Sequence, residues 1–258
     1  MNRVAAIAVY TFKESVRERV LYTLLIFAIL MIGAGLILGS VSVGINEVAL
    51  VNLGLSAISV FGLLIAVFIG ISLVWKEVER RTLYNVLSKP VARAEFILGK
   101  FFGLVLTLAV NTAVMTAGFY LLLWCEKGRI TAADRAPLEA IYFILLQLML
   151  VVGVALLFST ISSPALSAVF TLSLYVIGNL LDDVRSFGEQ SGSAALRGLL
   201  RAVSVVLPDF GAFSDIAPAA HGELVAGREI LSHSIYAVLY TAVLLSATIL
   251  IFERRDLR

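Results

Sequence analysis

The sequence has few of the residues on which metal and redox sites depend. It contains one cysteine, Cys125, and two histidines, His221 and His233, and its four methionines are scattered. One cysteine can form neither a disulfide within the chain nor a cysteine metal cluster. His221 and Glu223 are near one another, but a structural or catalytic zinc site needs three or four ligands, and a copper path needs clustered sulfur. The sequence therefore predicts no metal site.

Motifs for nucleotide binding and hydrolysis are also absent. No stretch has the form Gly-x-x-x-x-Gly-Lys-Ser/Thr, which holds nucleotide phosphates, and none has the His-Glu-x-x-His form of zinc proteases. The interiors of the long apolar runs lack Asp, Glu, Lys and Arg. Ion-coupled carriers usually place such groups there, at a cost of roughly 2.5–3.5 kcal/mol each. We expect a chain that is not an enzyme, binds no cofactor and receives its energy from elsewhere.

Apolar residues are abundant instead. They make up 60% of the 258 residues, against about 45–50% in soluble domains, and the mean hydropathy is +0.99. Runs that reach the roughly 20 residues needed to cross a bilayer predict an all-α polytopic membrane protein with one transmembrane domain over residues 1–258. The six predicted spans cover residues 20–39, 52–75, 101–124, 137–160, 165–181 and 233–252.

Two polar segments complete this topology. Residues 3–19 predict an amphipathic helix along the membrane interface, because Ala5, Val9, Phe12 and Val16 share one face; a solvated cytoplasmic helix is the alternative. Residues 182–232 form the longest polar region and are predicted to be extracytoplasmic. Within that region the pattern predicts a second interfacial helix over residues 193–207, ended by Pro208.

The distribution of positive charge predicts the orientation. With six spans, 13 of the 20 Lys and Arg residues lie in the segments on the side of the termini, and 7 lie in the opposite segments, which are longer in total. Lys and Arg concentrate on the cytoplasmic side of membrane proteins. We therefore expect both termini in the cytoplasm and the chain in a bacterial-type inner membrane.

Residues 76–100 form a charged loop between two uncharged apolar runs, and this loop faces the cytoplasm in the predicted topology. Apolar residues at helical spacing predict a short amphipathic helix over Glu77–Leu87. Pro90 should end it, since proline cannot continue the hydrogen-bond pattern and disfavours a helical residue before it. A second helix should then start near Ala92 and enter the membrane.

The order and spacing of residues in this loop form a recognisable pattern: Glu77, Thr82-Leu83, Leu87-Ser88, Pro90, Arg93, Glu95-Phe96 and Gly99-Lys100. This pattern resembles the first cytoplasmic loop of ABC-2 type permeases, the membrane subunits of a class of ATP-binding-cassette transporters. The amphipathic start resembles the elbow helix of that family. The resemblance implies a coupling helix that docks onto a separate cytoplasmic ATPase, which would bind the ATP and Mg²⁺. The implied docking residues are Glu77, Arg80, Arg81, Thr82, Leu83, Val86, Leu87, Pro90 and Arg93, of which Glu77 and Arg93 are expected to orient the loop.

A second resemblance concerns a branch of the family. The stretch Leu207-Pro208-Asp209-Phe210 with Phe213, and the ending Phe252–Leu257, resemble permeases labelled as multicopper-enzyme or nitrous-oxide-reductase maturation proteins. Because sulfur ligands are scattered, this label does not imply that the chain conducts copper.

The resemblance implies a permease subunit that works in pairs and exports an unidentified substrate. A homodimer is expected, and a heterodimer with a sister permease is the alternative. Candidate seam residues are the small residues Gly35, Gly39, Ala165 and Ala168, since small side chains let helices approach closely. The alternative function is a membrane anchor that couples an ATPase to lipid extraction or to an extracytoplasmic partner.

Asn111 and Gln147 are the candidate path-lining residues, because they are among the most polar residues in the middle of the predicted spans. Hydrogen bonding between helices, worth about 0.6 kcal/mol on average, is the alternative that we favour.

Overall fold

The computed structural model describes residues 3–17, 46–79, 92–128, 132–190 and 206–254, together with some of the residues at 26–33 and 198–204. All regular structure in these residues is helical, which confirms the predicted all-α class. The α-helices are α1 (Arg3–Arg17), α3 (Asn46–Glu79), α5 (Arg93–Lys127), α6 (Ala136–Ile161), α7 (Pro164–Asn179), α8 (Leu181–Gln190), α10 (Ile216–Ala220) and α11 (Gly227–Arg254), and short 3-10 turns cover Ala132–Arg135 and Gly211–Phe213.

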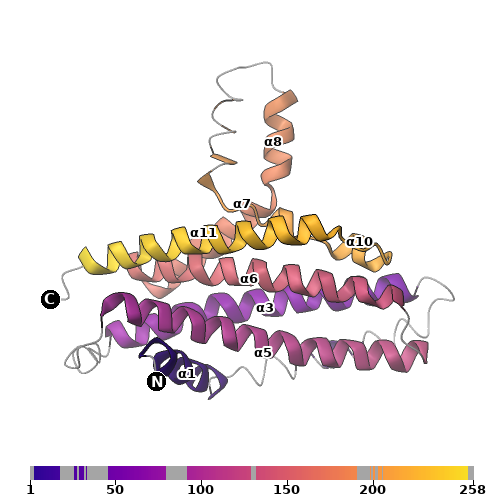
Figure 1. Ribbon diagram of the computed structural model, residues 1–258, viewed down its shortest axis with the longest axis horizontal. Helices are drawn as coiled ribbons and strands as arrows, with labels where there is room; N and C mark the ends of the chain where they lie inside the picture. Colours follow the sequence, from indigo (N-terminus) through magenta and orange to yellow (C-terminus); the bar gives the residue numbers. More distant parts are fainter. Residues whose placement is uncertain are drawn as a thin grey trace.

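Four of these helices, α3, α5, α6 and α11, lie side by side along the long axis of the molecule (Figure 1). Each is long and apolar enough to cross a membrane, and they correspond to the spans predicted at 52–75, 101–124, 137–160 and 233–252. Helices α7 and α8, bent by 53° at their junction, would make a fifth span if counted as one. The span predicted at 20–39 lies mostly outside the described residues, so the count of six stays a prediction.

The helices extend beyond the predicted spans because hydropathy marks the membrane-crossing part and not the end of the helix. Helix α3 starts at Asn46 and runs to Glu79, so Glu77 lies in its last turn. The described helix therefore continues past the predicted end of the span at residue 75 and includes Glu77, while most of the helix predicted over Glu77–Leu87 lies outside the described residues. By contrast, the predicted restart near Ala92 is confirmed: α5 begins at Arg93, and the Glu95 carboxylate accepts the Ala92 N–H at 3.1 Å.

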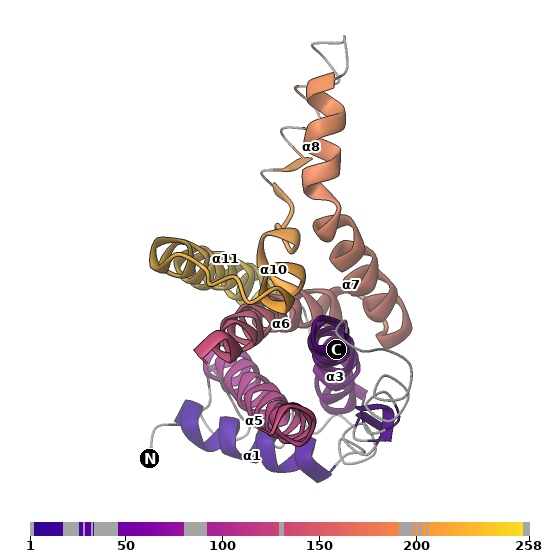
Figure 2. The ribbon, with the colours of Figure 1, turned by 90° about the vertical axis from the view of Figure 1, so that its right-hand side faces the viewer.

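Helix α6 lies at the centre of the bundle when the molecule is seen along its long axis (Figure 2). It is apolar on all sides, as expected of a helix surrounded by others, and Phe143, Leu148 and Val151 are fully buried. Close approach to its neighbours depends on small residues. A Cβ on Gly62 of α3 would lie 2.5 Å from a Leu148 methyl carbon.

Helix α1 crosses α5 at the end of the bundle where α5 starts and α11 ends (Figures 1 and 2). The predicted helix is confirmed over Arg3–Arg17. Two glycines of α5 make the contact possible: a Cβ on Gly99 would lie 2.6 Å from Ile7, and one on Gly103 would lie 2.6 Å from Thr11 and 2.7 Å from the Ala8 backbone oxygen. Val9, on the predicted apolar face, points away from α5 and is exposed, so that face remains available to lipid.

The opposite end of the bundle is held by charged groups. The Lys127 ammonium lies 2.6 Å from the Asp134 carboxylate, and it also pairs with Glu47 at the start of α3. The Tyr120 hydroxyl donates to the Asp134 backbone oxygen at 2.6 Å. These contacts join α3 and α5 to the 3-10 turn that precedes α6.

Candidate functional site

Arg93 ties the start of α5 to the end of α11. Its guanidinium donates to the backbone oxygens of Phe252 and Glu253, each 2.8 Å away, and lies 5.9 Å from the centre of the Phe252 ring. These carbonyls belong to the last turn of α11, where oxygens lack partners within the helix and the helix dipole favours a cation. Phe96 stacks on Phe252, with ring centres 6.0 Å apart. Arg93 therefore fixes the base of the predicted docking loop.

Helix α1 is joined to the same place by two ion pairs. Arg3 lies 3.8 Å from the Glu95 carboxylate near the start of α5. Lys100, whose side chain is 1% exposed, lies 3.6 Å from the Glu14 carboxylate, and its ammonium is 5.8 Å from the centre of the Phe96 ring. A lysine buried to this extent is rare unless it is paired. The contacts of Arg93 and Lys100 together make α1, the start of α5 and the end of α11 one packed unit.

Two of the predicted docking residues lie in the described part of the chain. Glu77 is in the last turn of α3 and Arg93 is the first residue of α5, and both helix ends lie at the same end of the bundle (Figure 1). The other predicted docking residues, from Arg80 to Pro90, lie outside the described residues. Contact with an ATPase stays a prediction for all of them.

A second polar region lies halfway along the bundle. Gln147, near the midpoint of α6, donates to the Phe210 backbone oxygen at 2.9 Å and lies 3.4 Å from the Asn179 side-chain oxygen at the end of α7. The Phe210 N–H donates in turn to the Gly178 backbone oxygen at 3.2 Å. The chain at residues 208–213, which belongs to the long polar region after α7, is thus inserted against α6 and α7.

Gly178 makes this insertion possible. A Cβ at this position would lie 2.4 Å from the Phe210 ring and 2.5 Å from the Pro208 backbone oxygen. Phe210 and Phe213 are both 1% exposed, and the Phe213 ring lies against Tyr236 of α11. The inserted segment therefore fills the space between α6, α7 and α11 and forms part of the core.

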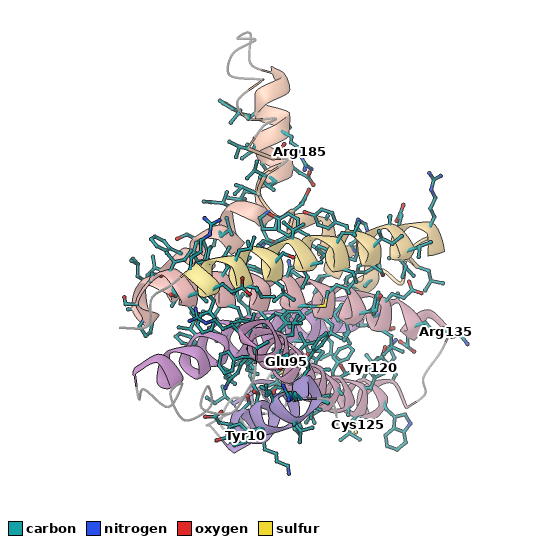
Figure 3. The ribbon with its side chains drawn as sticks, turned by 60° about the vertical axis from the view of Figure 1, so that its left-hand side comes forward. Tyr10, Glu95, Tyr120, Cys125, Arg135 and Arg185 are labelled. Atoms are coloured by element: carbon teal, nitrogen blue, oxygen red, sulfur yellow. The ribbon has the colours of Figure 1, made fainter. Side chains whose placement is uncertain are left out.

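Charges lie at the base of α8. The Arg185 guanidinium lies 2.8 Å from the Asp209 carboxylate and 2.9 Å from that of Asp182. Figure 3 shows Arg185 partway along α8, on the part that projects from the bundle. The Asp209 N–H donates to the Tyr236 hydroxyl at 2.9 Å. Sequence reasoning singled out Leu207–Phe210 only as a resemblance to a branch, and nothing in the sequence paired Asp209 with a residue 24 positions earlier.

The remaining predicted residues are not brought together. Asn111 is buried and donates to the Thr107 backbone oxygen of its own helix at 2.8 Å. Ala165 is exposed at the start of α7, and Ala168 is partly covered by the core. Gly35 and Gly39 lie outside the described residues. Their predicted roles in the path and the dimer seam stay predictions.

A shallow groove runs along the surface between α5 and α6, with a volume of about 440 Å³. Ala109, Ala113 and Ala117, spaced by four residues on α5, leave it open, and the Tyr120 and Tyr142 rings also line it. Among the described residues, no three His, Cys, Asp or Glu side chains gather as metal ligands would. His233 lies against the rings of Phe143 and Phe213.

A sequence model of the family described as ABC-2 family transporter protein matches residues 5–257, nearly the whole chain. No curated protein matches the chain. The match covers the spans, the loop at residues 76–100 and the inserted segment, and it does not assign the maturation branch.

Proposed function

Because the chain belongs to the ABC-2 transporter family, we propose that it is the membrane-spanning permease subunit of an ABC transporter that exports a substrate. The family match over residues 5–257 carries this proposal. The chain is a multi-pass membrane protein, and we place it in a bacterial-type inner membrane with both termini in the cytoplasm. ATP hydrolysis, with its Mg²⁺, takes place in a separate ATPase subunit, and this chain supplies the path and the docking surface.

The arrangement at one end of the bundle supports this division of labour. The loop that follows α3 returns to α5 at Arg93, which is hydrogen-bonded to the end of α11. Force applied to the loop would therefore reach α5, α11 and, through Lys100 and Glu14, α1 as one unit. Two permease copies and two ATPases complete the transporter, and closure of the ATPases on ATP rocks the two copies against each other.

Docking is tested by one substitution in the loop. Leu83→Asp places a charge on the apolar face of the predicted coupling helix, and it should abolish co-purification of the ATPase while the chain still inserts into the membrane. Leu83→Met is the matched control, since it keeps an apolar side chain of similar volume. Recovery of the ATPase with Leu83→Asp at the level of the unchanged protein would contradict docking through this helix.

Transport is tested by reconstitution. Liposomes containing the chain and its ATPase should accumulate or release substrate when ATP is present and remain inactive with a non-hydrolysable analogue. ATP hydrolysis that depends on the chain but moves nothing across the bilayer would instead favour the membrane anchor that extracts lipid or acts on an extracytoplasmic partner. Single-molecule photobleaching in nanodiscs, with two steps expected, tests the homodimer.

A further inference from the structure

Helix α8 leaves the bundle sideways and at half its length. In two views at right angles it projects away from the long helices, roughly perpendicular to them (Figures 1 and 2). Hydrogen bonds locate its base. Tyr240, at the midpoint of α11, donates to the Val206 backbone oxygen at 2.7 Å, and Gln147, near the midpoint of α6, donates to that of Phe210. Arg185 joins α8 to this level through Asp209.

This level lies deep within a membrane. Gln147 is eleven residues from the start of α6, which corresponds to about 17 Å at 1.5 Å per residue. The hydrocarbon core of a bilayer is about 30 Å thick, so the base of α8 lies far from either surface if the long helices cross the membrane.

The composition of α8 is incompatible with lipid on all sides. Its sequence, LDDVRSFGEQ, contains four charged residues, and the Asp182 side chain is 73% exposed. Charged groups within the bilayer face protein or water and not acyl chains. The helix also has an apolar edge at i, i+3 and i+6, of which Leu181 is buried while Phe187 is 65% exposed. One side of α8 therefore needs water and the other needs an apolar protein surface.

We propose that α8 is an arm that packs its Phe187 edge against a second copy of this chain, with its charged side facing a water-filled chamber between the two copies. The depth of its base favours a second copy, because a soluble partner cannot reach this level and lipid cannot solvate the charges. This inference rests on the proposed function, since it assigns the contact surface of the permease pair. In this arrangement Arg185 and Asp209 line the chamber. The sequence had instead suggested Asn111 and Gln147 as the path-lining residues.

The first part of the test asks whether the Phe187 edge of α8 contacts a second copy of the chain. A photo-activated benzoyl-phenylalanine replaces Phe187, and in a second protein it replaces Val243, which is 66% exposed on α11. Two differently tagged copies are expressed together with the ATPase and irradiated in membranes. An adduct carrying both tags at twice the mass of the chain is expected from position 187 and not from position 243. Absence of that adduct at 187, or an adduct with any other protein, overturns the proposal.

The second part of the test asks whether water reaches the charged side of α8. In a Cys125→Ser background, Asp182→Cys, which is 73% exposed on the charged side of α8, should react with a membrane-impermeant maleimide added from outside. Leu239→Cys, exposed on α11 at the level of Tyr240, should not. If position 182 is protected from the maleimide as strongly as position 239, the proposed water-filled chamber is wrong. The ATPase is purified from the same membranes, so its loss indicates failure of the proposed function, whereas its recovery without the 187 adduct indicates failure of the arm alone.

Discussion

The α1–α5 interface and the base of α8 are both held by ion pairs, but the two regions are built differently. At the first, two helices meet backbone to backbone over Gly99 and Gly103, and Lys100 is 1% exposed. At the second, Arg185 remains 41% exposed, and the chain bends by 53° between α7 and α8. Close packing at these glycines holds α1 against the bundle. The polar junction instead holds α8 in a direction that leaves most of its surface without a covering element in the described chain.

The comparison suggests which parts move together. Helices α1, α5 and α11 share side-chain contacts at the loop end, so displacement of one has to displace the others, because packed interiors resist deformation. The α8 side is fastened at fewer points, chiefly through the segment at 206–210. We expect the first region to transmit force and the second to change its surroundings during the transport cycle.

The largest effect is expected from Gly103→Leu. The new side chain would meet Thr11 and the backbone oxygen of Ala8, so α1 would have to move away, at a cost of about 3 kcal/mol. Thermal unfolding in detergent and proteolysis of α1 measure the loss. Gly118→Leu is the control on the same helix, because a Cβ there meets Phe27 only at 3.9 Å. Equal destabilisation by both substitutions would contradict tight packing of α1.

Gly178→Ala should loosen the second region without releasing α1. The added methyl would overlap Phe210 and the Pro208 backbone oxygen, and we expect a loss of about 1–3 kcal/mol. Hydrogen exchange should rise in residues 206–213 and remain unchanged in α1. Gly227→Ala, where nothing lies within 4 Å of the new carbon, provides the control; a uniform rise throughout the chain would count against a local role of Gly178.

Double-mutant cycles compare the two ion pairs directly. Combining Lys100→Met with Glu14→Gln should give a coupling free energy of about 1–3 kcal/mol, in the range for groups that contact one another. Combining Arg185→Gln with Asp209→Asn should give less than about 1 kcal/mol in detergent, because Arg185 is solvated. A larger coupling free energy for Arg185 and Asp209 than for Lys100 and Glu14 would show that side-chain exposure does not determine the strength of these two ion pairs.

Asn111→Leu should have the smallest effect on stability. The Asn111 amide donates to its own helix and not to another, so its removal should cost less than the roughly 0.6 kcal/mol that is the average for a polar contact between membrane helices. Transport in liposomes should remain close to that of the unchanged protein. A large loss of transport with unchanged stability would support the path-lining role considered from the sequence.

Local signals in the sequence were sufficient to predict the long apolar helices, but not α8 or α10. Long apolar runs predicted α3, α5, α6 and α11, because each span must satisfy its backbone hydrogen bonds internally wherever it contacts lipid. The start of α5 at Arg93 followed from Pro90 and the residues after it. The end of α3 at Glu79 was not predicted, because the helix continues for a few residues after its sequence stops being apolar.

The sequence by itself determined the all-α class, the apolar segments and the family pattern of the loop, because each depends on residues close together in the chain. Only the tertiary structure decided that Lys100 is buried beside Glu14, that Gly178 admits Phe210, and that Asp209 meets Arg185 at half the length of the bundle. The spans themselves were expected to lack charge in their interiors, and the ionisable groups found halfway along the bundle, Arg185 and Asp209, belong to the polar region that follows α7. Such pairings depend on how distant helices pack, which no run of neighbouring residues specifies.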